Sequence, residues 1–434
     1  MGNTLLPSFC WATGIENTFI PQVRPGLRAM DQYALTQHYQ LWQSDIDCVA
    51  ATGVQAVRWG IPWYLVQPKP NQWDWRWVDQ VLDYMVNVKG LIPILDLMHY
   101  GTPLWLDNSF INNRYPQKVA EYAGAVAARY KSLVRYYTPL NEPTVNAEYC
   151  GLKGHWPPYL TGEDGYLKVL MAVAKGIVLT TQALQAEQPE MITVQVEALR
   201  RYWATEVTAQ PQVALLNAHQ YLPFDLVTGR VDEEHPLYVH LRLHSIEPAD
   251  LAWFRANAVQ FDYLGVNFYP WSYGELVPGK AGKLYRVRRR VHGSALTEVM
   301  REAYARYGLP MLVTETSARG SIKVRGRWMD ETVAAVAELR RQGVPVVGYT
   351  WFPLISMIDW HYRRGRRPLN YYLLHLGLYD AAFDEEGVLC RHATPLVARY
   401  QQHMATPMPE LANTTLAGEQ PKVWPVQRSA IAAD

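Results

Sequence analysis

Cysteine is scarce in this sequence, with four residues in 434, and the positions of these residues exclude several classes of protein. Cys10, Cys48, Cys150 and Cys390 lie far apart and form no CxxC pair. No group of histidines and cysteines has the sequence spacing of a zinc site. We therefore expect no disulfide framework, no metal and no cofactor.

An excess of charge of one sign is also missing. The chain has 41 lysine and arginine residues against 40 acidic residues, which gives a formal net charge of +1. Such a balance creates no overall field that favours nucleic acid or an anionic membrane. A small neutral ligand fits this balance better, and the oligomeric state is left open.

Signals for export and membrane insertion are missing as well. The N-terminal stretch MGNTLLPSFCWATG has no basic segment followed by an apolar one. No later run of about 18 uncharged apolar residues is present that could span a bilayer. We expect a cytoplasmic protein without integral membrane association.

Aromatic residues, in contrast, are plentiful. The chain contains 16 tryptophans and 28 tyrosines, and 49% of its residues are hydrophobic, enough for a large core. Flat aromatic rings with polar edges suit the alternating apolar and hydroxyl faces of sugars. The count alone is equally consistent with aromatic residues that only fill the core.

Short apolar runs recur at intervals of roughly 35 to 70 residues, with helical periodicity between them. Near-continuous apolar runs are typical of parallel strands that are covered on both faces. Two of the helical segments end at glycines, Gly53 and Gly343, as helix C-termini often do. Eight such units predict an α/β fold, a single (β/α)8 TIM barrel. The runs begin near Cys10, Val54, Leu91, Val134, Met191, Phe261, Pro310 and Val344.

The remaining length is assigned to long loops and a tail. The main loops after strands are expected at 145–166 and 270–290. We expect the barrel to occupy residues 1–404 and an irregular tail to occupy 405–434, because the tail has no helical or strand period. Trp424 is the candidate residue for contact between this tail and the barrel.

Polar residues stand at the ends of most of the predicted strands. In a TIM barrel the chemistry takes place at the carboxyl ends of the strands, where the βα loops begin. A lone histidine or tyrosine is more often a packing residue, but so many at equivalent positions indicate one site. They are Arg58, Trp59, His99, Asn141, Glu142, Asn267, Tyr269, Glu315 and Trp351.

Two of these residues are glutamates, Glu142 after the fourth strand and Glu315 on the seventh. Hydrolysis of a glycoside needs one carboxylic acid to protonate the leaving oxygen and one carboxylate at the anomeric carbon. Arg58 is the cation expected to keep the second carboxylate ionised. Two unrelated ion pairs are the alternative interpretation.

Several motifs resemble those of the family 1 glycoside hydrolases, from Phe9 to about Asp380. They are TPLNEP, VTETS, VRWGIPW, LMHYGTP, GVNFY, and GYTWFPL with IDW. The resemblance implies that Glu142 is the acid/base and Glu315 the nucleophile, supported by Arg58, Asn267 and Tyr269. It further implies that the sugar contacts Asn141, through its 2-hydroxyl, and His99, Trp351, Asp359 and Trp360.

Some positions depart from the family pattern. Where the family has a sugar-binding glutamine, this chain has ATGIENT, so Glu16 or Asn17 takes that role. Asp359 stands near the place of a longer glutamate, and Thr316 stands where asparagine is usual. The sugar is therefore less defined than the reaction.

Two basic runs, YRVRRRVHG and HYRRGRRP, allow a 6-phosphorylated sugar or an acidic aglycone, although such runs are usually solvated faces. The reading favoured by the sequence is a retaining β-glycosidase for a small β-glycoside. Its carboxyl groups are then expected about 5 to 5.5 Å apart. A glycosyltransferase that uses the same two glutamates is the nearest alternative, and a non-catalytic sugar-binding barrel is a more distant one.

Overall fold

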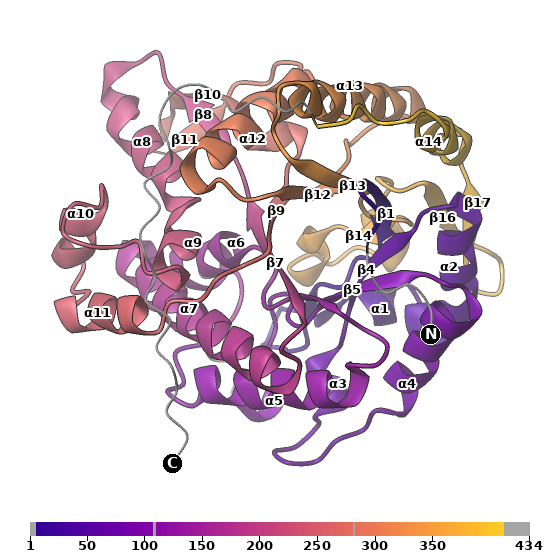
Figure 1. The fold of residues 1–434 in the computed structure, drawn as a ribbon, viewed down its shortest axis with the longest axis horizontal. Coiled ribbons are helices and arrows are strands. Elements are labelled where there is room, and N and C mark those ends of the chain that lie inside the picture. Colours follow the sequence, from indigo (N-terminus) through magenta and orange to yellow (C-terminus); the bar gives the residue numbers. More distant parts are fainter. Residues whose placement is uncertain (1–5, 107–109, 281–282, 412–434) are drawn as a thin grey trace.

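The structure is a computed structural model that describes residues 6–106, 110–280 and 283–411. Eight parallel strands close into a barrel, in the order β1-β13-β12-β9-β7-β6-β5-β4 (Figure 1). All eight coincide with the apolar runs, so the predicted (β/α)8 barrel is confirmed. The strands are β1 Cys10–Gly14, β4 Ala56–Gly60, β5 Ile92–Asp96, β6 Tyr136–Thr138, β7 Ile192–Ala198, β9 Tyr263–Asn267, β12 Met311–Thr316 and β13 Val346–Trp351.

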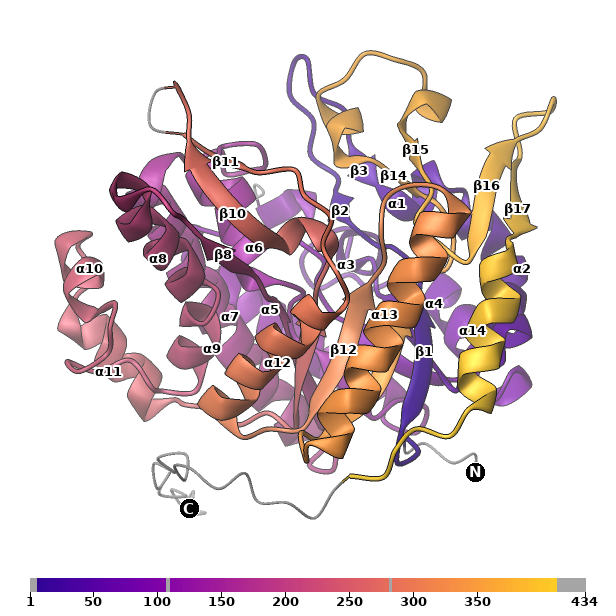
Figure 2. The same cartoon turned by 90° about the horizontal axis from the view of Figure 1, so that it is seen from above.

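Helices surround the barrel because every strand needs an apolar cover on its outer face. Figure 2 shows three of them, α12, α13 and α14, side by side along β12 and β1. The longer helices are α2 His38–Thr52, α4 Arg76–Asp83, α5 Tyr115–Tyr130, α7 Gly162–Glu187, α8 Gln210–His219, α11 Pro248–Ala256, α12 Ser294–Tyr307, α13 Ile322–Arg341 and α14 Pro395–Ala405. The shorter ones are α1 Gln32–Leu35, α3 Trp63–Val66, α6 Pro143–Ala147, α9 Leu222–Val227 and α10 Tyr238–Leu243.

The predicted helix ends are confirmed. Helix α2 stops at Gly53, which adopts φ 85° and donates its backbone N–H to the carbonyl of Ala50. Gly343 follows α13 and has φ 79°. Both positions use the left-handed conformation that glycine adopts without a steric penalty.

The two long loops contain regular structure that the sequence did not indicate. The first holds α6 and a π-helix, Glu148–Leu152. The second holds the strands β10 Tyr273–Pro278 and β11 Leu284–Arg286, and β10 also pairs with β8 Arg201–Trp203. The predicted long loops are therefore present, and part of their length forms short helices and strands.

These additions stand on one side of the barrel. Figure 2 shows β10 and β11 there together with the segments that follow β13. The latter are β14 Met357–Ile358, the 3-10 helix η7 Trp360–Arg363, β15 Leu373–Leu374, and the hairpin of β16 Tyr379–Phe383 and β17 Leu389–Ala393. A further short pair, β2 Phe19–Ile20 and β3 Met30–Asp31, follows β1.

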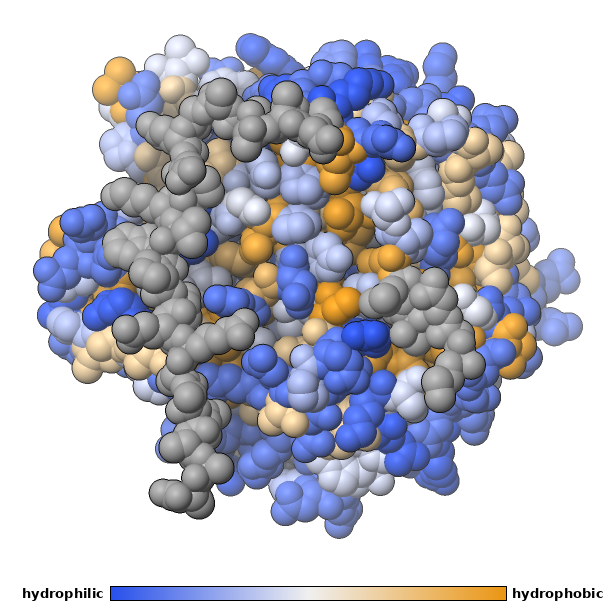
Figure 3. Space-filling view, in the orientation of Figure 1, coloured by the Kyte–Doolittle hydropathy of each residue, from blue (hydrophilic) through white to orange (hydrophobic). Residues whose placement is uncertain are grey.

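The barrel interior is filled at its other end. Small and apolar side chains form a separate buried cluster inside the strands: Cys10, Ala12, Ala56, Ile94, Tyr136, Val194, Val196 and Leu312. Figure 3 views this end, with polar side chains around the periphery and apolar ones visible toward the centre. The open space of the barrel therefore lies at the carboxyl ends of its strands, where chemistry was expected.

Among the described residues, one helix, α7, is long and apolar enough to cross a membrane. About two thirds of its most apolar window, 67%, is buried inside the molecule, which is the pattern of a core helix. The cytoplasmic location stays a prediction. The division between barrel and tail at residue 404 also stays a prediction, although α14 ends nearby, at Ala405. Trp424, the candidate contact between tail and barrel, lies outside the described residues.

Candidate active site

A cavity of about 810 Å³ opens at the carboxyl ends of the barrel strands. Of the twelve residues that the sequence assigned to the site, eight line this cavity. They are Glu16, His99, Glu142, Asn267, Tyr269, Glu315, Asp359 and Trp360. The structure therefore gathers residues from both ends of the chain into one site.

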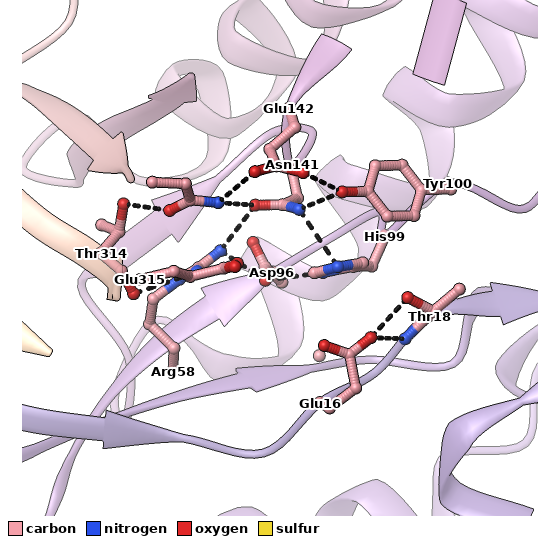
Figure 4. Close-up of polar contacts among 12 residues, drawn as sticks. Glu16, Thr18, Arg58, Asp96, His99, Tyr100, Asn141, Glu142, Thr314 and Glu315 are labelled. Atoms are coloured by element: carbon pink, nitrogen blue, oxygen red, sulfur yellow. Dashed lines mark hydrogen bonds and ion pairs between the residues drawn. The ribbon is translucent and has the colours of Figure 1, made fainter. Parts of the chain in front are cut away.

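Arg58, on β4, lies beneath this cavity and contacts residues of β12, of β5 and of the segment that follows β6 (Figure 4). Its Nη1 donates to Glu315 Oε1 at 2.7 Å, and its Nη2 donates to Asp96 Oδ2 at 2.7 Å and to Asn141 Oδ1 at 3.1 Å. Burial opposes the charge of Arg58, but Asp96 and Glu315 outweigh burial and raise its pKa. Arg58 is therefore a fixed cation under the two glutamates.

Glu315 is held at both oxygens. Arg58 contacts Oε1, and the hydroxyl of Tyr269 donates to Oε2 at 2.7 Å. The register of β12 against β9 shifts between Val313 and Glu315, which indicates a β-bulge. Bulges re-aim side chains beside active sites. Here the bulge lets Thr314 contact Asn267 while Glu315, the next residue, contacts Arg58.

Glu142 has a different setting. Asn267 Nδ2 donates to its Oε1 at 3.0 Å, and the hydroxyl of Tyr100 donates to its Oε2. Burial and the nearby charge of Glu315 raise the pKa of Glu142 to about 7, despite these hydrogen bonds. A carboxyl with this pKa is protonated in a large fraction of molecules near neutral pH, so it can act as an acid.

His99 and Glu16 lie on the opposite wall. Burial opposes protonation of His99, but Asp96, whose Oδ2 is 3.2 Å from Nδ1, and Glu16 together raise its pKa. Burial, and to a smaller extent Glu315, raises the pKa of Glu16, which accepts hydrogen bonds from the backbone and hydroxyl of Thr18. The charges of Glu16, His99 and Asp96 therefore influence one another.

Asp359 and Trp360 close the cavity on the side that follows β13. Asp359 Oδ1 accepts from the backbone and ring of His361, and its Oδ2 lies 3.5 Å from Arg319 Nη2. Trp360 packs at 5.0 Å from Trp156, measured between ring centroids. Both residues line the cavity, and their contacts with a sugar stay a prediction.

Four predicted residues are not in the cavity wall: Asn17, Arg58, Asn141 and Trp351. Asn141 is fully buried, and its side-chain nitrogen lies 3.1 Å from His99 Nε2 and donates to the Tyr100 hydroxyl at 2.9 Å, so its contact with a sugar 2-hydroxyl stays a prediction. Trp351 is fully buried, and its indole N–H donates to the carbonyl of Leu376 at 3.1 Å. Its predicted contact with the sugar also stays a prediction.

The structure also separates Glu16 from Asn17, between which the sequence could not choose. The Asn17 amide packs where a side chain at Gly60 would stand, because an added Cβ there would lie 1.6 Å from Asn17 Nδ2. Glu16, in contrast, lines the cavity. Of the two candidates, only Glu16 is placed to meet a ligand.

Sequence reasoning missed several residues that organise this site. Tyr100 follows His99 directly and connects Asn141 to Glu142, and Thr314 donates to Asn267 Oδ1 at 2.7 Å and so orients that amide. Both adjoin quoted motif residues, which was the available signal. Glu197 on β7 is fully buried, and burial raises its pKa well above the usual range; no motif marked it.

The cavity wall contains seven lysine and arginine side chains alongside six carboxylic side chains. Only the first of the two basic runs contributes arginines to it, whereas in the second run Arg363 is buried and donates to the carbonyls of Gln22 at 2.7 Å and Arg28 at 2.8 Å. Of the second run, His361 lines the cavity. The basic side chains in the wall are Lys153, Arg200, Arg286, Arg289, Arg290, Arg319 and Arg327.

Comparison with known proteins gives the family of this chain. A sequence profile described as "Glycosyl hydrolase family 1" matches residues 22–270, more than half of the chain. β-Glucosidase 47 of Arabidopsis thaliana is 23% identical over 407 residues, covering 80% of this chain and 72% of that protein. A 6-phospho-β-glucosidase of Clostridium longisporum is 22% identical over 413 residues, covering 85% of each.

Solved structures show the same fold. The β-glucosidase from Thermotoga maritima, in complex with castanospermine, superposes with a TM-score of 0.79 at 16% identity. The alignment covers 93% of this chain and 98% of that structure. With the profile match, these likenesses identify the chain as a glycoside hydrolase that belongs to glycosyl hydrolase family 1.

Proposed function

We propose that this glycoside hydrolase is a retaining β-glycosidase that cleaves a small β-glycoside by double displacement. In this reaction Glu315 attacks the anomeric carbon and Glu142 protonates the leaving oxygen. The observation that carries the proposal is the unequal setting of the two carboxyls. Both oxygens of Glu315 accept hydrogen bonds from Arg58 and Tyr269, whereas the pKa of Glu142 is raised to about 7.

The coupling between the carboxyls lets Glu142 serve first as acid and then as base. The negative charge of Glu315 helps to keep the proton on Glu142. Formation of the glycosyl ester removes that charge, so the pKa of Glu142 falls and it can accept a proton from water. The water oxygen then bonds to the anomeric carbon as the ester bond breaks. The separation of about 5 to 5.5 Å between the carboxyls stays a prediction.

The two roles can be separated with alanine variants. Glu315→Ala removes the nucleophile, so turnover should collapse for every β-glycoside, with a loss of at least about 1,000-fold. Glu142→Ala removes only the proton donor and later base. With dinitrophenolate as leaving group no proton is needed, so the first step should stay fast, the glycosyl-enzyme should accumulate, and both kcat and KM should fall. Steady-state kinetics on dinitrophenyl and alkyl glycosides measure both effects.

Azide supplies the control for this assignment. It should release the intermediate of Glu142→Ala as the β-glycosyl azide, because azide needs no general base. Glu338→Ala, a change of an exposed glutamate on α13, should leave all rates unchanged. Equal losses on both substrates in Glu142→Ala, without azide rescue, would show that Glu142 is not the acid/base.

The wild-type protein separates the alternative functions. Mainly elongated glycoside in dilute acceptor would identify a transferase, and a wild type that binds sugar without turnover would identify a binding protein.

The basic cavity wall supports a finer proposal: the substrate carries a negative charge. Seven basic side chains line the cavity, whereas Glu148, Glu331 and Asp359 are the acids in the wall apart from Glu16 and the catalytic pair. The side chain of Arg327 makes no hydrogen bond or ion pair with any residue in the described part of the chain. Clustered cations of this kind recognise phosphate or carboxylate groups.

Three substrates test whether the negative charge lies on the sugar or on the aglycone: a nitrophenyl β-glucoside, its 6-phosphate, and an aryl β-glucoside with a carboxylate on the aglycone. We expect one of the two anionic substrates to have a KM lower than the neutral one, and we expect salt to raise that KM because ions screen the attraction. Arg327→Ala should raise it about tenfold, the loss of one charged contact. Arg366→Ala, an exposed arginine outside the wall, is the matched control. A preference for the neutral glucoside would contradict this finer proposal and leave the catalytic one intact.

A further inference from the structure

Three side chains that are far apart in the sequence meet outside the barrel. Glu163 lies in the first turn of α7, His219 at the end of α8, and His240 in α10. Figure 1 shows these three helices together on the left flank of the molecule. None of the three side chains lines the catalytic cavity.

The three side chains direct their electron-pair donors toward one another. Glu163 Oε1 lies 3.1 Å from His219 Nε2 and 2.9 Å from His240 Nε2, and all three donor atoms lie within 4.8 Å of one another. His219 is 5% exposed at its side chain, and its Nε2 is buried without a hydrogen bond to any described residue. This nitrogen faces the carboxylate oxygen but is not aligned to bond with it.

We propose that Glu163, His219 and His240 bind one divalent transition-metal ion, and that Zn²⁺ is the ion they fit best. Two imidazole nitrogens and one carboxylate oxygen form a ligand set that zinc uses, with a water at the fourth position. Bonds of about 2.0 to 2.1 Å to a tetrahedral ion place ligand atoms ~3.3 Å apart, close to the two distances here. Mg²⁺ and Ca²⁺ prefer oxygen ligands and match less well.

An ion at the centre would also satisfy the buried His219 nitrogen. Zn²⁺ accepts a lone pair from each of the three donors, whereas hydrogen bonding alone asks one carboxylate oxygen to serve two imidazoles. Entry is open, because the side chains of Glu163 and His240 are 20% and 22% exposed. The linear spacing of the residues hid this cluster, since their helices belong to two different crossovers between barrel strands.

The place of these three residues indicates what a bound ion would do to the structure. Helix α7 begins directly after the loop that carries Tyr149 and Lys153, which line the catalytic cavity. An ion shared by three helices fixes the start of α7 against α8 and α10. We therefore expect Zn²⁺ to stabilise the fold, because a ligand that binds only the native state shifts unfolding toward the native side.

Calorimetric titration of ZnCl₂ into chelator-stripped, tag-free protein tests the proposal. We expect one ion per chain, a higher melting temperature with Zn²⁺, and, with Co²⁺, the intense visible bands of a four-coordinate ion. His240→Ala and Glu163→Gln should each weaken Zn²⁺ binding by at least about 100-fold. His240 is preferred to the buried His219, because its replacement leaves the core intact; circular dichroism verifies the fold of each variant.

His403→Ala is the matched control, since His403 is also carboxylate-paired, at 2.9 Å from Asp330, and is 24% exposed. It should bind Zn²⁺ as the wild type does. The absence of stoichiometric binding by the wild type would overturn the proposal, and so would full binding by both His240→Ala and Glu163→Gln. The latter result would place any bound ion elsewhere, for instance among the carboxylates of the catalytic cavity.

Discussion

At the scale of single residues, Glu142 carries two features that oppose folding. Its backbone has φ 47° and ψ 65°, the left-handed region that a non-glycine residue occupies at a cost of roughly 1–3 kcal/mol. Its side chain is buried beside a second carboxylate, and this raises its pKa to about 7. Both features follow from placing an acid at the end of β6, where the proposed chemistry needs it.

The raised pKa predicts how stability depends on pH. Folded Glu142 holds its proton up to a higher pH than the unfolded chain does, so its contribution is complete below the unfolded pKa and is lost as pH rises through about 7. Glu142→Gln cannot ionise. We expect the stability of wild type relative to Glu142→Gln to fall by on the order of 3 kcal/mol between about pH 4.5 and 8. Urea unfolding across this range measures it.

Glu148 supplies the contrast for this experiment. Burial opposes its charge, but Arg200 and Lys153 lower its pKa to about 2, so its contribution is lost only as pH falls toward that value. Glu148→Gln should therefore differ from wild type by an amount that is constant between about pH 5 and 8. A constant difference for Glu142→Gln as well would show that Glu142 does not titrate in this window.

Strand ends were enough to predict where most of the site residues lie, but not what each side chain contacts. Glu142, Glu315 and Tyr269 follow from their positions on a barrel. The orientation of Asn17 depends on the missing side chain of Gly60, which is 43 positions away, and no local pattern contains that information. The partners of the buried Asn141 amide, His99 and Tyr100, follow a different strand, β5, and no local pattern indicated them either.

At the scale of elements, the sequence predicted strands and helix ends well because these depend on local pattern. The bulge in β12 and the β10–β11 hairpin depend on pairing with distant strands, β9 and β8, and were not predictable. Loops that carry function are the segments where such long-range pairing decides the structure.

The C-terminus of α2 allows a test of this local control. Gly53 has φ 85°, and a Cβ there would meet only Met404 Cε at 3.7 Å, so the penalty of a side chain comes from the backbone alone. Gly53→Ala should lower the free energy of unfolding by roughly 1–2 kcal/mol and leave kcat/KM unchanged. Denaturant unfolding and kinetics on one substrate measure the two quantities.

Gly53→Asn provides the comparison, because asparagine tolerates the left-handed conformation better than alanine does. It should lose clearly less stability than Gly53→Ala. Equal losses in both variants would mean that the penalty arises from packing against Met404 and not from the backbone of the helix end.

At the scale of the whole molecule, the barrel closes where its first and last strands meet. Strand β1 pairs with β13 over four residues, from Cys10 with Gly348 to Thr13 with Trp351. The fold was predictable because eight buried parallel strands with helical crossovers have one common closed arrangement. The charge of the cavity wall was not predictable, because its basic side chains come from segments distributed over more than 170 residues.

Tyr400 on α14 covers this seam, so removal of its hydroxyl oxygen tests how the barrel closes. Its buried hydroxyl lies 2.7 Å from the carbonyl oxygen of Ala12 on β1 and 3.0 Å from that of Tyr349 on β13. Tyr400→Phe keeps the ring, and with it the edge-on packing against Trp11, but leaves both carbonyls without this donor.

The free energy of unfolding of Tyr400→Phe should fall by about 1–3 kcal/mol while kcat/KM stays unchanged, because the site lies at the other end of the strands. Tyr371→Phe, at a 69% exposed tyrosine, should change neither quantity. If Tyr400→Phe is as stable as wild type, the Tyr400 hydroxyl adds nothing to barrel closure, and β1 is held against β13 by the strand pairing and the other contacts of α14.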